Sequence, residues 1–363
     1  MTAAPDVPPL QVRAMGVTIE IRVPDQASRD RLAGQWSRAV VDPPEKPAAT
    51  ISAWDGDSDN EVVRDYGVTT RVTMAGLRAT AGRRVNLHAG GVADADGRLL
   101  ALVAPSGTGK TTATRALASR LGYVSDETIS IDSEGVVYPH PKPLSVLTDP
   151  SSKHHKLQLS PDEVGLLPTP ELARLARVVM LHRGGDGPRG LSRLGTAAAL
   201  LQLVEQSSSM SQLPRPLRTL VGLLHDCGGA RVLTYDEIEE HLDDLTALLA
   251  EPDDVPPAEE LVWHAGQEGF PLVESEGPLL ARLPFAEAVE VDHELVVLTE
   301  SHAWLLADLT AAIWLHVAEP SSMQDLVAAA QERFGAHDRA EEVVRSAVAT
   351  LAQENLLAWG SLA

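Results

Sequence analysis

The sequence predicts an α/β protein with a central domain built on a strand–glycine loop–helix unit in a mixed sheet. A small strand-rich module precedes this domain and a winged-helix-like module follows it. Three observations carry the prediction. A glycine-rich loop separates a short apolar run from a stretch with helical spacing within residues 99–121. An Asp-Gly turn just before that run indicates a hairpin, so the sheet is not wholly parallel. After residue 277, two short strands precede three short helices.

Composition narrows the class of protein. A chain of 363 residues suggests two or three domains. The 30 basic against 51 acidic residues give a net charge of −21, which disfavours nucleic acid or an anionic membrane as the main partner. A single cysteine, Cys227, allows no internal disulfide and fits a reducing cytoplasm. No signal peptide and no apolar run of membrane-spanning length is visible, so we expect a cytoplasmic protein.

Residues 1–83 are predicted to form the strand-rich module. Alternating apolar residues indicate one strand over Val12–Val23, and a shorter strand follows at Thr50–Trp54. Between them, Asp25–Val41 has helical spacing, with Asp25 as a candidate N-cap. Partial alternation over Tyr66–Leu77 is interpreted as a further strand. The module carries no recognisable chemical signature.

Residues 84–250 are predicted to form the central domain. Its first strand, Arg84–Val92, contains His88, and the turn Asp94–Arg98 joins it to the apolar strand Leu99–Val103. The loop Ala104–Thr111 then leads into a helix. Strand, glycine loop and helix in this order are the context of a phosphate-binding loop, although Ala104 stands where the usual pattern has Gly.

The chemistry of such a loop assigns a role to each residue type. Gly107 and Gly109 allow the backbone to turn its N–H groups onto phosphate oxygens, and the helix start adds further donors. Lys110 supplies positive charge to the β- and γ-phosphates, and Thr111 offers a hydroxyl to Mg²⁺. The candidate nucleotide-binding residues are Ser106, Gly107, Thr108, Gly109, Lys110, Thr111 and Thr112.

Two adjacent carboxylates, Asp126 and Glu127, follow the next predicted strand. Near a phosphate-binding loop, such a pair can divide the work: one accepts the proton of an attacking hydroxyl and the other holds Mg²⁺. The alternative is a solvated acidic turn. For two further features, phosphate binding and a solvated loop remain alternative interpretations. These features are the basic segment 151–156 and the arginines Arg183 and Arg189.

The C-terminal part begins after a proline-rich acidic linker, residues 251–275, and covers residues 276–363. Val289–Leu298 is predicted as two strands around a turn at Asp292 and His293. Helices are predicted over Leu305–Val317, Met323–Phe334 and Arg339–Leu357. A DNA-binding winged helix is the alternative, which the few basic residues of this part disfavour.

The central segment LHAGGVADADGRLLALVAPSGTGKTTATRALASRLGYVSDETISI resembles the catalytic core of the HPr kinase/phosphorylase family, which is similar to phosphoenolpyruvate carboxykinase. The resemblance extends over about residues 88–249. It implies an ATP- and Mg²⁺-dependent transfer of phosphate to a serine hydroxyl, and an assembly of several copies. The family's later glycine-containing signature is not recognisable, so HPr itself is not the expected substrate.

Carried over by position, this resemblance implies that Asp126 is the general base, that Lys110 is catalytic and that His88 lies beside the phosphates. Thr111 and Glu127 would hold Mg²⁺, although Glu127 stands where the family has Asp. The alternative for His88 is a structural role, with its hydrogen bonds made where it lies in the strand.

The second resemblance covers about residues 277–359. The segments EVDHELVVLTESHAWLLADLTAAIWLHV, SSMQDLVAAAQERFG and ENLLAW are similar to PqqD-like domains. This similarity implies recognition of a leader peptide by strand addition. A kinase core joined to such a domain fits the phosphorylation of a peptide or small protein in modified-peptide (RiPP) biosynthesis. The alternatives are a nucleotide switch or slow ATPase that serves as a docking protein, and a small-molecule kinase.

Overall fold

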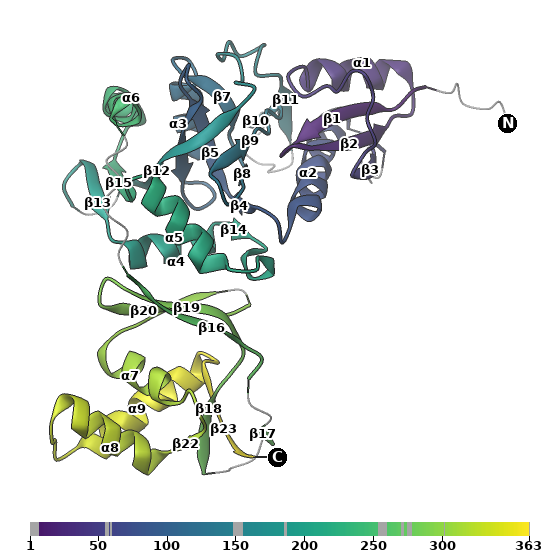
Figure 1. Cartoon of the computed structure of the whole chain (residues 1–363). Helices are drawn as coiled ribbons and strands as arrows, with labels where there is room; N and C mark the ends of the chain where they lie inside the picture. Colours follow the sequence, from purple (N-terminus) through teal and green to yellow (C-terminus); the bar gives the residue numbers. More distant parts are fainter. Residues whose placement is uncertain are drawn as a thin grey trace. The chain divides into compact units, whose positions relative to one another are not determined.

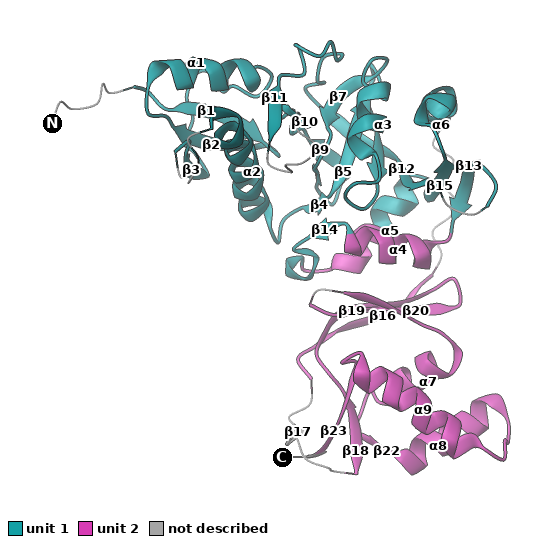
Figure 2. Ribbon diagram, turned by 180° about the vertical axis from the view of Figure 1, so that it is seen from behind, with its two compact units in different colours: residues 1–194, 206–213, 222–257 teal, residues 195–205, 214–221, 258–363 magenta. Residues whose placement is uncertain are grey.

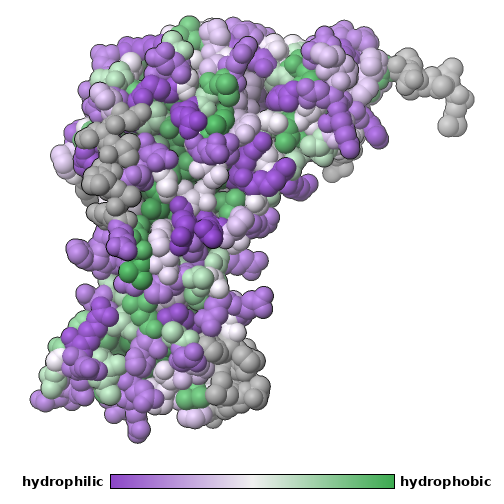
Figure 3. Space-filling view, viewed as in Figure 1, coloured by the Kyte–Doolittle hydropathy of each residue, from purple (hydrophilic) through white to green (hydrophobic). Residues whose placement is uncertain are grey.

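The computed structural model describes residues 7–54, 58, 60–147, 155–184, 187–252, 260–269, 272–273, 278–300 and 302–362 (Figure 1). The chain divides into two compact units, coloured separately in Figure 2. Unit 1 comprises residues 1–194, 206–213 and 222–257, and unit 2 comprises residues 195–205, 214–221 and 258–363. Hydrophilic side chains cover most of the visible surface of each unit in Figure 3, as the net charge of −21 leads one to expect.

Unit 1 begins with a three-stranded sheet packed on two helices. The elements are β1 (Leu10–Ala14), β2 (Val17–Arg22), α1 (Gln26–Gln35), β3 (Ala49–Ser52) and α2 (Glu61–Thr80). The single strand predicted over Val12–Val23 is wrong, because Met15 and Gly16 adopt positive φ angles of 52° and 73° and turn the chain into a hairpin. The Asp25 cap is confirmed: its Oδ1 accepts a hydrogen bond of 2.7 Å from the N–H of Ser28.

The prediction of a strand over Tyr66–Leu77 is also wrong, since this stretch lies within α2. Its buried apolar residues Val68, Val72 and Ala75 recur every three or four positions, a spacing that only a helix places on one face. The Asn60 side chain caps the helix by accepting from the N–H of Val62 at 2.9 Å. The N-terminal module therefore contains more helix than strand.

The centre of unit 1 is a mixed sheet, as predicted. Ten of the described strands form it, in the order β14-β4-β8-β9-β12-β6-β5-β7, with β15 beside β12 and β13 beside β15. Strand β12 runs parallel to β6 and β15, whereas β5 and β6 are antiparallel and joined by the predicted turn, in which the Asp94 N–H donates to the Arg98 carbonyl at 3.0 Å. The turn of this antiparallel hairpin thus lies at the start of β6, and the glycine loop lies at its end.

The remaining elements of unit 1 complete this sheet and cover it. Its strands are β4 (Val85–Leu87), β5 (Ala89–Ala93), β6 (Arg98–Val103), β7 (Gly122–Ser125), β8 (Ile129–Ile131), β9 (Val136–Tyr138), β12 (Ala173–Arg183), β13 (Gly190–Leu194), β14 (Ser207–Ser208) and β15 (Ala230–Tyr235). A separate pair is β10 (Leu144–Leu147) and β11 (Lys156–Leu159). The helices are α3 (Lys110–Leu117), η1 (Met210–Gln212), η2 (Ile238–His241) and α6 (Leu242–Ala250). Helices α3 and α6 share one apolar core with β5, β6 and β12.

Unit 2 contains two four-stranded sheets among its described residues. The strands are β16 (Val262–Gln267), β17 (Leu272–Val273), β18 (Leu279–Arg282), β19 (Phe285–Val291), β20 (Glu294–Leu298), β21 (Ala303–Leu306), β22 (Ser321–Ser322) and β23 (Leu357–Leu362). The helices are α7 (Asp308–His316), α8 (Met323–Phe334) and α9 (Ala340–Gln353). The predicted hairpin is confirmed, with Asp292 and His293 at φ 53° and 65°. The helix predicted from Leu305 begins only at Asp308, because the preceding residues pair as β21.

Unit 2 also contains two segments that come earlier in the chain than residue 258. They are α4 (Thr196–Glu205) and the first part of α5 (Pro216–Asp226). Two carboxylates cap their first turns. Asp292 Oδ2 accepts from the N–H of Ala197 at 2.9 Å, and Glu287 Oε2 accepts from the N–H groups of Leu217 and Arg218 at 2.8 and 3.1 Å. Negative charge at a helix start satisfies donors that the helix leaves unpaired.

Candidate functional site

The glycine loop between β6 and α3 has the backbone that its sequence indicates. Gly107 and Gly109 adopt φ angles of +85° and +98°, which cost glycine little and other residues much more. A side chain at Gly107 would meet no atom within 4 Å, so the loop is open on that side. Thr108 donates from Oγ1 to the Pro105 carbonyl at 2.7 Å and so closes the turn.

Helix α3 begins at Lys110 with no side-chain cap from Gly109. Its first N–H groups therefore point out of the loop as donors for an anion. Ser106 and Thr112 are exposed, while Thr108 and Thr111 are half-buried, so a ligand can reach the loop from solvent. This arrangement could hold a phosphate group.

Lys110 is 6% exposed and turns inward. Its Nζ donates to the carbonyls of Ala104 and Pro105, the latter at 3.1 Å. Burial lowers the pKa of Lys110 to about 8, against the opposing charges of Glu127 and Asp126. The ammonium group therefore lies inside the loop and within electrostatic reach of the acidic pair.

Asp126 and Glu127 follow β7 directly. Asp126 is only 4% exposed, and the Tyr123 hydroxyl donates to its Oδ1 at 3.0 Å. The Glu127 side chain remains 41% exposed. A solvated acidic turn does not describe Asp126, because its carboxylate is buried and hydrogen-bonded. The predicted residues His88 and Lys110 lie within electrostatic reach of Asp126 and Glu127, and these four side chains are called the polar cluster below.

His88 lies between β4 and β5 and is half-buried, with its backbone N–H donating to the Gln206 carbonyl at 2.6 Å. Burial and the neighbouring charge of Lys110 lower the pKa of His88, while Glu127 and Asp126 act in the opposite direction. The imidazole is therefore mainly neutral at pH 7. Neutral His88 can donate one hydrogen bond and accept another at the edge of the cluster.

Lys142 is a member of the cluster that sequence reasoning missed. Its Nζ lies 3.0 Å from Asp126 Oδ1 and 3.3 Å from Glu127 Oε2, and its side chain is 3% exposed. Burial opposes its charge, but the two carboxylates outweigh burial and raise the pKa of Lys142. In return, Lys142 is the main cause that lowers the pKa of Glu127. The only sequence signal was a lysine between two prolines in an otherwise apolar stretch.

The neighbouring His140 is fully buried, and its Nε2 lies 3.1 Å from Thr73 Oγ1. Burial lowers the pKa of His140 to about 4, with the charge of Lys142 acting in the same direction. The unfolded chain has a histidine pKa near 6.5, so it binds a proton between pH 6.5 and 4 that the folded protein does not.

Stability is therefore expected to fall by about 3 kcal/mol as the pH drops from 7 to 4, relative to a His140→Gln variant. Urea unfolding of both proteins across this pH range measures the free energy of unfolding of each. Taking the difference between the two proteins removes the effect of the other titrating groups. Parallel curves for the two proteins would show that His140 does not stay neutral in the fold.

The remaining candidate phosphate-binding residues are two arginines and the basic segment 151–156. Arg189 donates to both carboxylate oxygens of Asp236 at 2.7 and 2.8 Å, and Arg183 pairs with Glu237 at 3.1 Å. Both arginines are thus engaged in exposed ion pairs. Of the basic segment, residues 151–154 lie outside the described residues.

Thr111 and Glu127 lie at the edge of the loop and of the cluster, both partly exposed. Within the described ranges, no group of three or more His, Cys, Asp or Glu side chains could hold a metal ion. A magnesium ion at this place would need phosphate oxygens or water in addition to the protein ligands, as Mg²⁺ commonly does.

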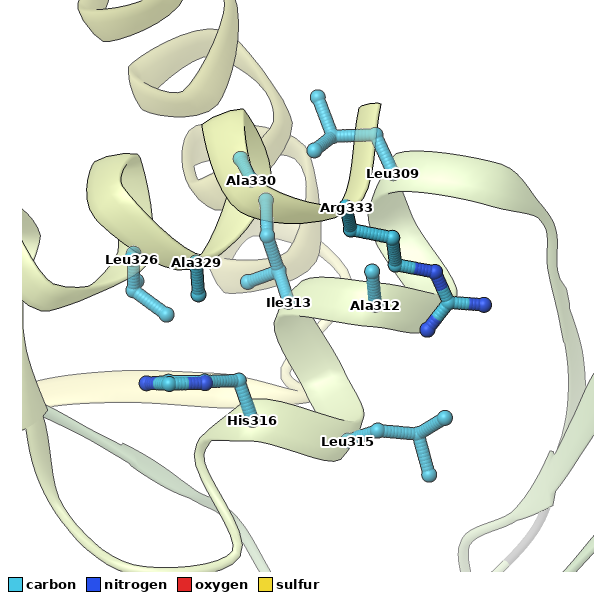
Figure 4. A pocket seen from close by; sticks show the side chains of 9 residues that line it. All are labelled: Leu309, Ala312, Ile313, Leu315, His316, Leu326, Ala329, Ala330 and Arg333. Carbon is cyan, nitrogen blue, oxygen red and sulfur yellow. The ribbon is translucent and has the colours of Figure 1, made fainter. Parts of the chain in front are cut away.

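Unit 2 has its own hollow, with a volume of about 300 Å³, on the helices α7 and α8 (Figure 4). Apolar side chains dominate the lining, and His316 and Arg333 are its polar members. A separate feature is the sheet β16-β19-β20-β21, in which β16 and β21 are the outer strands. Outer strands present unpaired backbone groups that can bind another chain.

In the part of the chain that the structure describes, no helix is both long and apolar enough to cross a bilayer. A search of curated proteins finds no match to this chain. A scan against protein families matches residues 294–357 to Coenzyme PQQ synthesis protein D (PqqD). The matched stretch contains β20, β21 and the helices α7, α8 and α9. The predicted resemblance of the C-terminal part is thereby confirmed over these residues, and unit 2 carries a PqqD-like domain.

Proposed function

We propose that this protein is an ATP- and Mg²⁺-dependent kinase that transfers phosphate to a hydroxyl group, a serine of a peptide or small protein, in the biosynthesis of a modified peptide. The observation that carries the proposal is that Lys110 and Asp126, both buried, lie within electrostatic reach of each other beside an open glycine loop. The resemblance of this segment to HPr kinases supports it.

The residues present fit a nucleotide and its metal ion. The amide groups around Gly107 and Gly109 and the ammonium of Lys110 would hold the phosphates, and Thr111 and Glu127 would hold Mg²⁺. Bound Mg·ATP supplies the phosphoryl group, whose bond to the β-phosphate breaks as a bond to the acceptor oxygen forms and ADP leaves.

The chain's own residues then have two tasks. Asp126 accepts the proton of the acceptor hydroxyl. Among the described residues, Tyr123 and Lys142 both reach its Oδ1 and none reaches Oδ2, so Oδ2 is the oxygen that serves as base. Lys110 neutralises negative charge in the glycine loop, where burial strengthens electrostatic interactions.

The PqqD-like domain would deliver the substrate. PqqD-like domains bind peptide or protein partners in RiPP biosynthesis, and a leader peptide can add as a strand to β16 or β21, the outer strands of the sheet. The single cysteine, Cys227, is buried, and a chain with one cysteine suits the reducing cytoplasm.

The proposal is tested by incubating the protein with γ-labelled ATP, Mg²⁺ and a panel of acceptors: peptides encoded by neighbouring genes, free serine and no acceptor. Label is expected on a serine-bearing peptide. Lys110→Ala is expected to lower the rate by about 10²–10³-fold, because a charge aimed at the reacting phosphates is lost. Lys46→Ala, the removal of an exposed lysine, is the matched control and should not change the rate.

The other outcomes decide against the proposal. Label only on free serine would indicate a small-molecule kinase. Tight binding of ATP without label on any acceptor would indicate a nucleotide switch, and release of labelled phosphate alone would indicate an ATPase.

A further inference from the structure

Lys142 lies in an unusual place for a lysine. It belongs to the segment 139–143 between β9 and β10, and its side chain is 3% exposed. Burying an ammonium group is costly unless partners compensate it. Here Asp126 Oδ1 lies at 3.0 Å and Glu127 Oε2 at 3.3 Å, and Nζ donates to the Pro143 carbonyl at 3.2 Å. Three acceptors thus fix the three hydrogens of one ammonium group.

The Lys142 ammonium also determines how Asp126 is oriented. Lys142 and the Tyr123 hydroxyl converge on the same carboxylate oxygen, from the segment 139–143 and from β7. Two donors on one oxygen leave the carboxylate no freedom to rotate without losing both. In addition, the positive charge offsets the repulsion between the adjacent Asp126 and Glu127 carboxylates.

The N-terminal module holds the segment that carries Lys142. The Met15 N–H donates to the Pro139 carbonyl at 3.2 Å, and Thr73 Oγ1 on α2 lies 3.1 Å from His140 Nε2. The Trp36 ring at the end of α1 lies 6.0 Å from the His140 ring. The Lys142 N–H donates to the His140 carbonyl at 2.8 Å, so the anchored histidine and the lysine form one tight turn.

We propose that Lys142 is a positioning residue for Asp126, and that the N-terminal module serves the phosphoryl-transfer site by fixing the segment that carries Lys142. The inference rests on the proposed function and assigns a role to residues 1–83, for which the sequence gives no chemical signature. Lys142 acts through Asp126: it orients Oδ2 toward the acceptor and does not itself bind substrate.

The test is a double-mutant cycle of Lys142→Met, Asp126→Asn and the double variant, assayed with the acceptor that wild type labels. Lys142→Met is expected to lower kcat by about 10²-fold and to leave the KM for ATP within about threefold, because misplacing a reacting group by about 1 Å costs this much. In the Asp126→Asn background, the same change should lower kcat by less than about threefold. Urea unfolding of all four proteins shows whether each variant is folded.

A second variant keeps the lysine and loosens its support. Thr73→Val removes the hydroxyl beside His140, and Thr70→Val is the control, since Thr70 is an exposed residue of the same helix. Thr73→Val is expected to speed amide hydrogen exchange in residues 139–143 and to lower kcat by about tenfold. Thr70→Val should do neither.

The outcomes separate the two ideas. If wild type labels no acceptor, the proposed function fails, and the role of Lys142 in transfer fails with it. If wild type labels a peptide but Lys142→Met loses the same factor with and without Asp126, Lys142 does not act through Asp126. If Thr73→Val speeds exchange in the segment and leaves kcat unchanged, the N-terminal module has no part in positioning.

Discussion

Asn in place of Asp126 is expected to lower the rate of phosphate transfer by about 10²–10⁴-fold, the range typical of a lost general base. Asn keeps the size of the side chain and can still accept from Tyr123 and Lys142, which lie 3.0 Å from Asp126 Oδ1. It cannot take up the proton of the acceptor hydroxyl. Binding of Mg·ATP should change by less than about threefold, because the glycine loop and Lys110 are untouched.

The measurement is single-turnover transfer of labelled phosphate, with the dissociation constant for Mg·ATP determined on the same samples. Asp96→Asn is the matched control, since Asp96 is an exposed carboxylate in the hairpin turn before β6. Asp126→Asn leaves Lys142 with Glu127 as its one carboxylate partner in place of two, so circular dichroism must show a folded protein. A folded Asp126→Asn protein that transfers phosphate at the wild-type rate would remove Asp126 from the role of base.

Local sequence predicted the parts of the site that local chemistry controls. The glycine loop needs positive φ angles at Gly107 and Gly109, which glycine adopts readily. The spacing of these two glycines between a strand and a helix is what predicted a phosphate-binding loop. The Asp-Gly turn at residues 94–98 likewise specified a hairpin by itself. Such features can be predicted from the sequence because a few consecutive residues determine them.

Contacts between residues that are far apart in the sequence could not be predicted. Lys142 reaches Asp126 because β9 runs antiparallel to β8 and returns the chain toward the end of β7, and no periodicity in the sequence predicts this contact. Helix α4 and part of α5 belong to unit 2 because Asp292 and Glu287 cap them across 95 and 70 residues of sequence. The stretch over Tyr66–Leu77 was mistaken for a strand because partial alternation resembles a helical pattern when a few apolar residues are missing.

Ala in place of Trp314 is expected to destabilise unit 2 by about 3–5 kcal/mol, the usual cost of removing a buried tryptophan. The Trp314 side chain on α7 is fully buried and meets Phe285 edge to face, with ring centroids 4.9 Å apart. The Arg282 guanidinium lies 3.8 Å from its ring and donates through Nε to the Trp314 carbonyl at 2.7 Å. Removal of the ring therefore leaves a cavity and deprives a buried cation of an aromatic face.

Hydrogen exchange followed by mass spectrometry localises this effect. Faster exchange is expected in residues 279–357, while residues 98–125 of unit 1 keep their wild-type protection, because the two units have separate apolar cores. Trp359→Ala is the control within the same unit: Trp359 is 36% exposed, and its loss should cost less than about 1 kcal/mol. Equal effects of the two substitutions would mean that Trp314 is not central to this core.

The same variant separates the two halves of the proposed function. With the core of the PqqD-like domain loosened, transfer to a leader-bearing peptide should fall at low peptide concentration and recover as the concentration rises, because binding is impaired and the chemistry is not. ATP affinity, which the proposed function assigns to residues 104–112 and to Lys110 in particular, should stay as in wild type. A loss of transfer that saturating peptide does not restore would mean that unit 2 contributes to catalysis and not to substrate delivery alone.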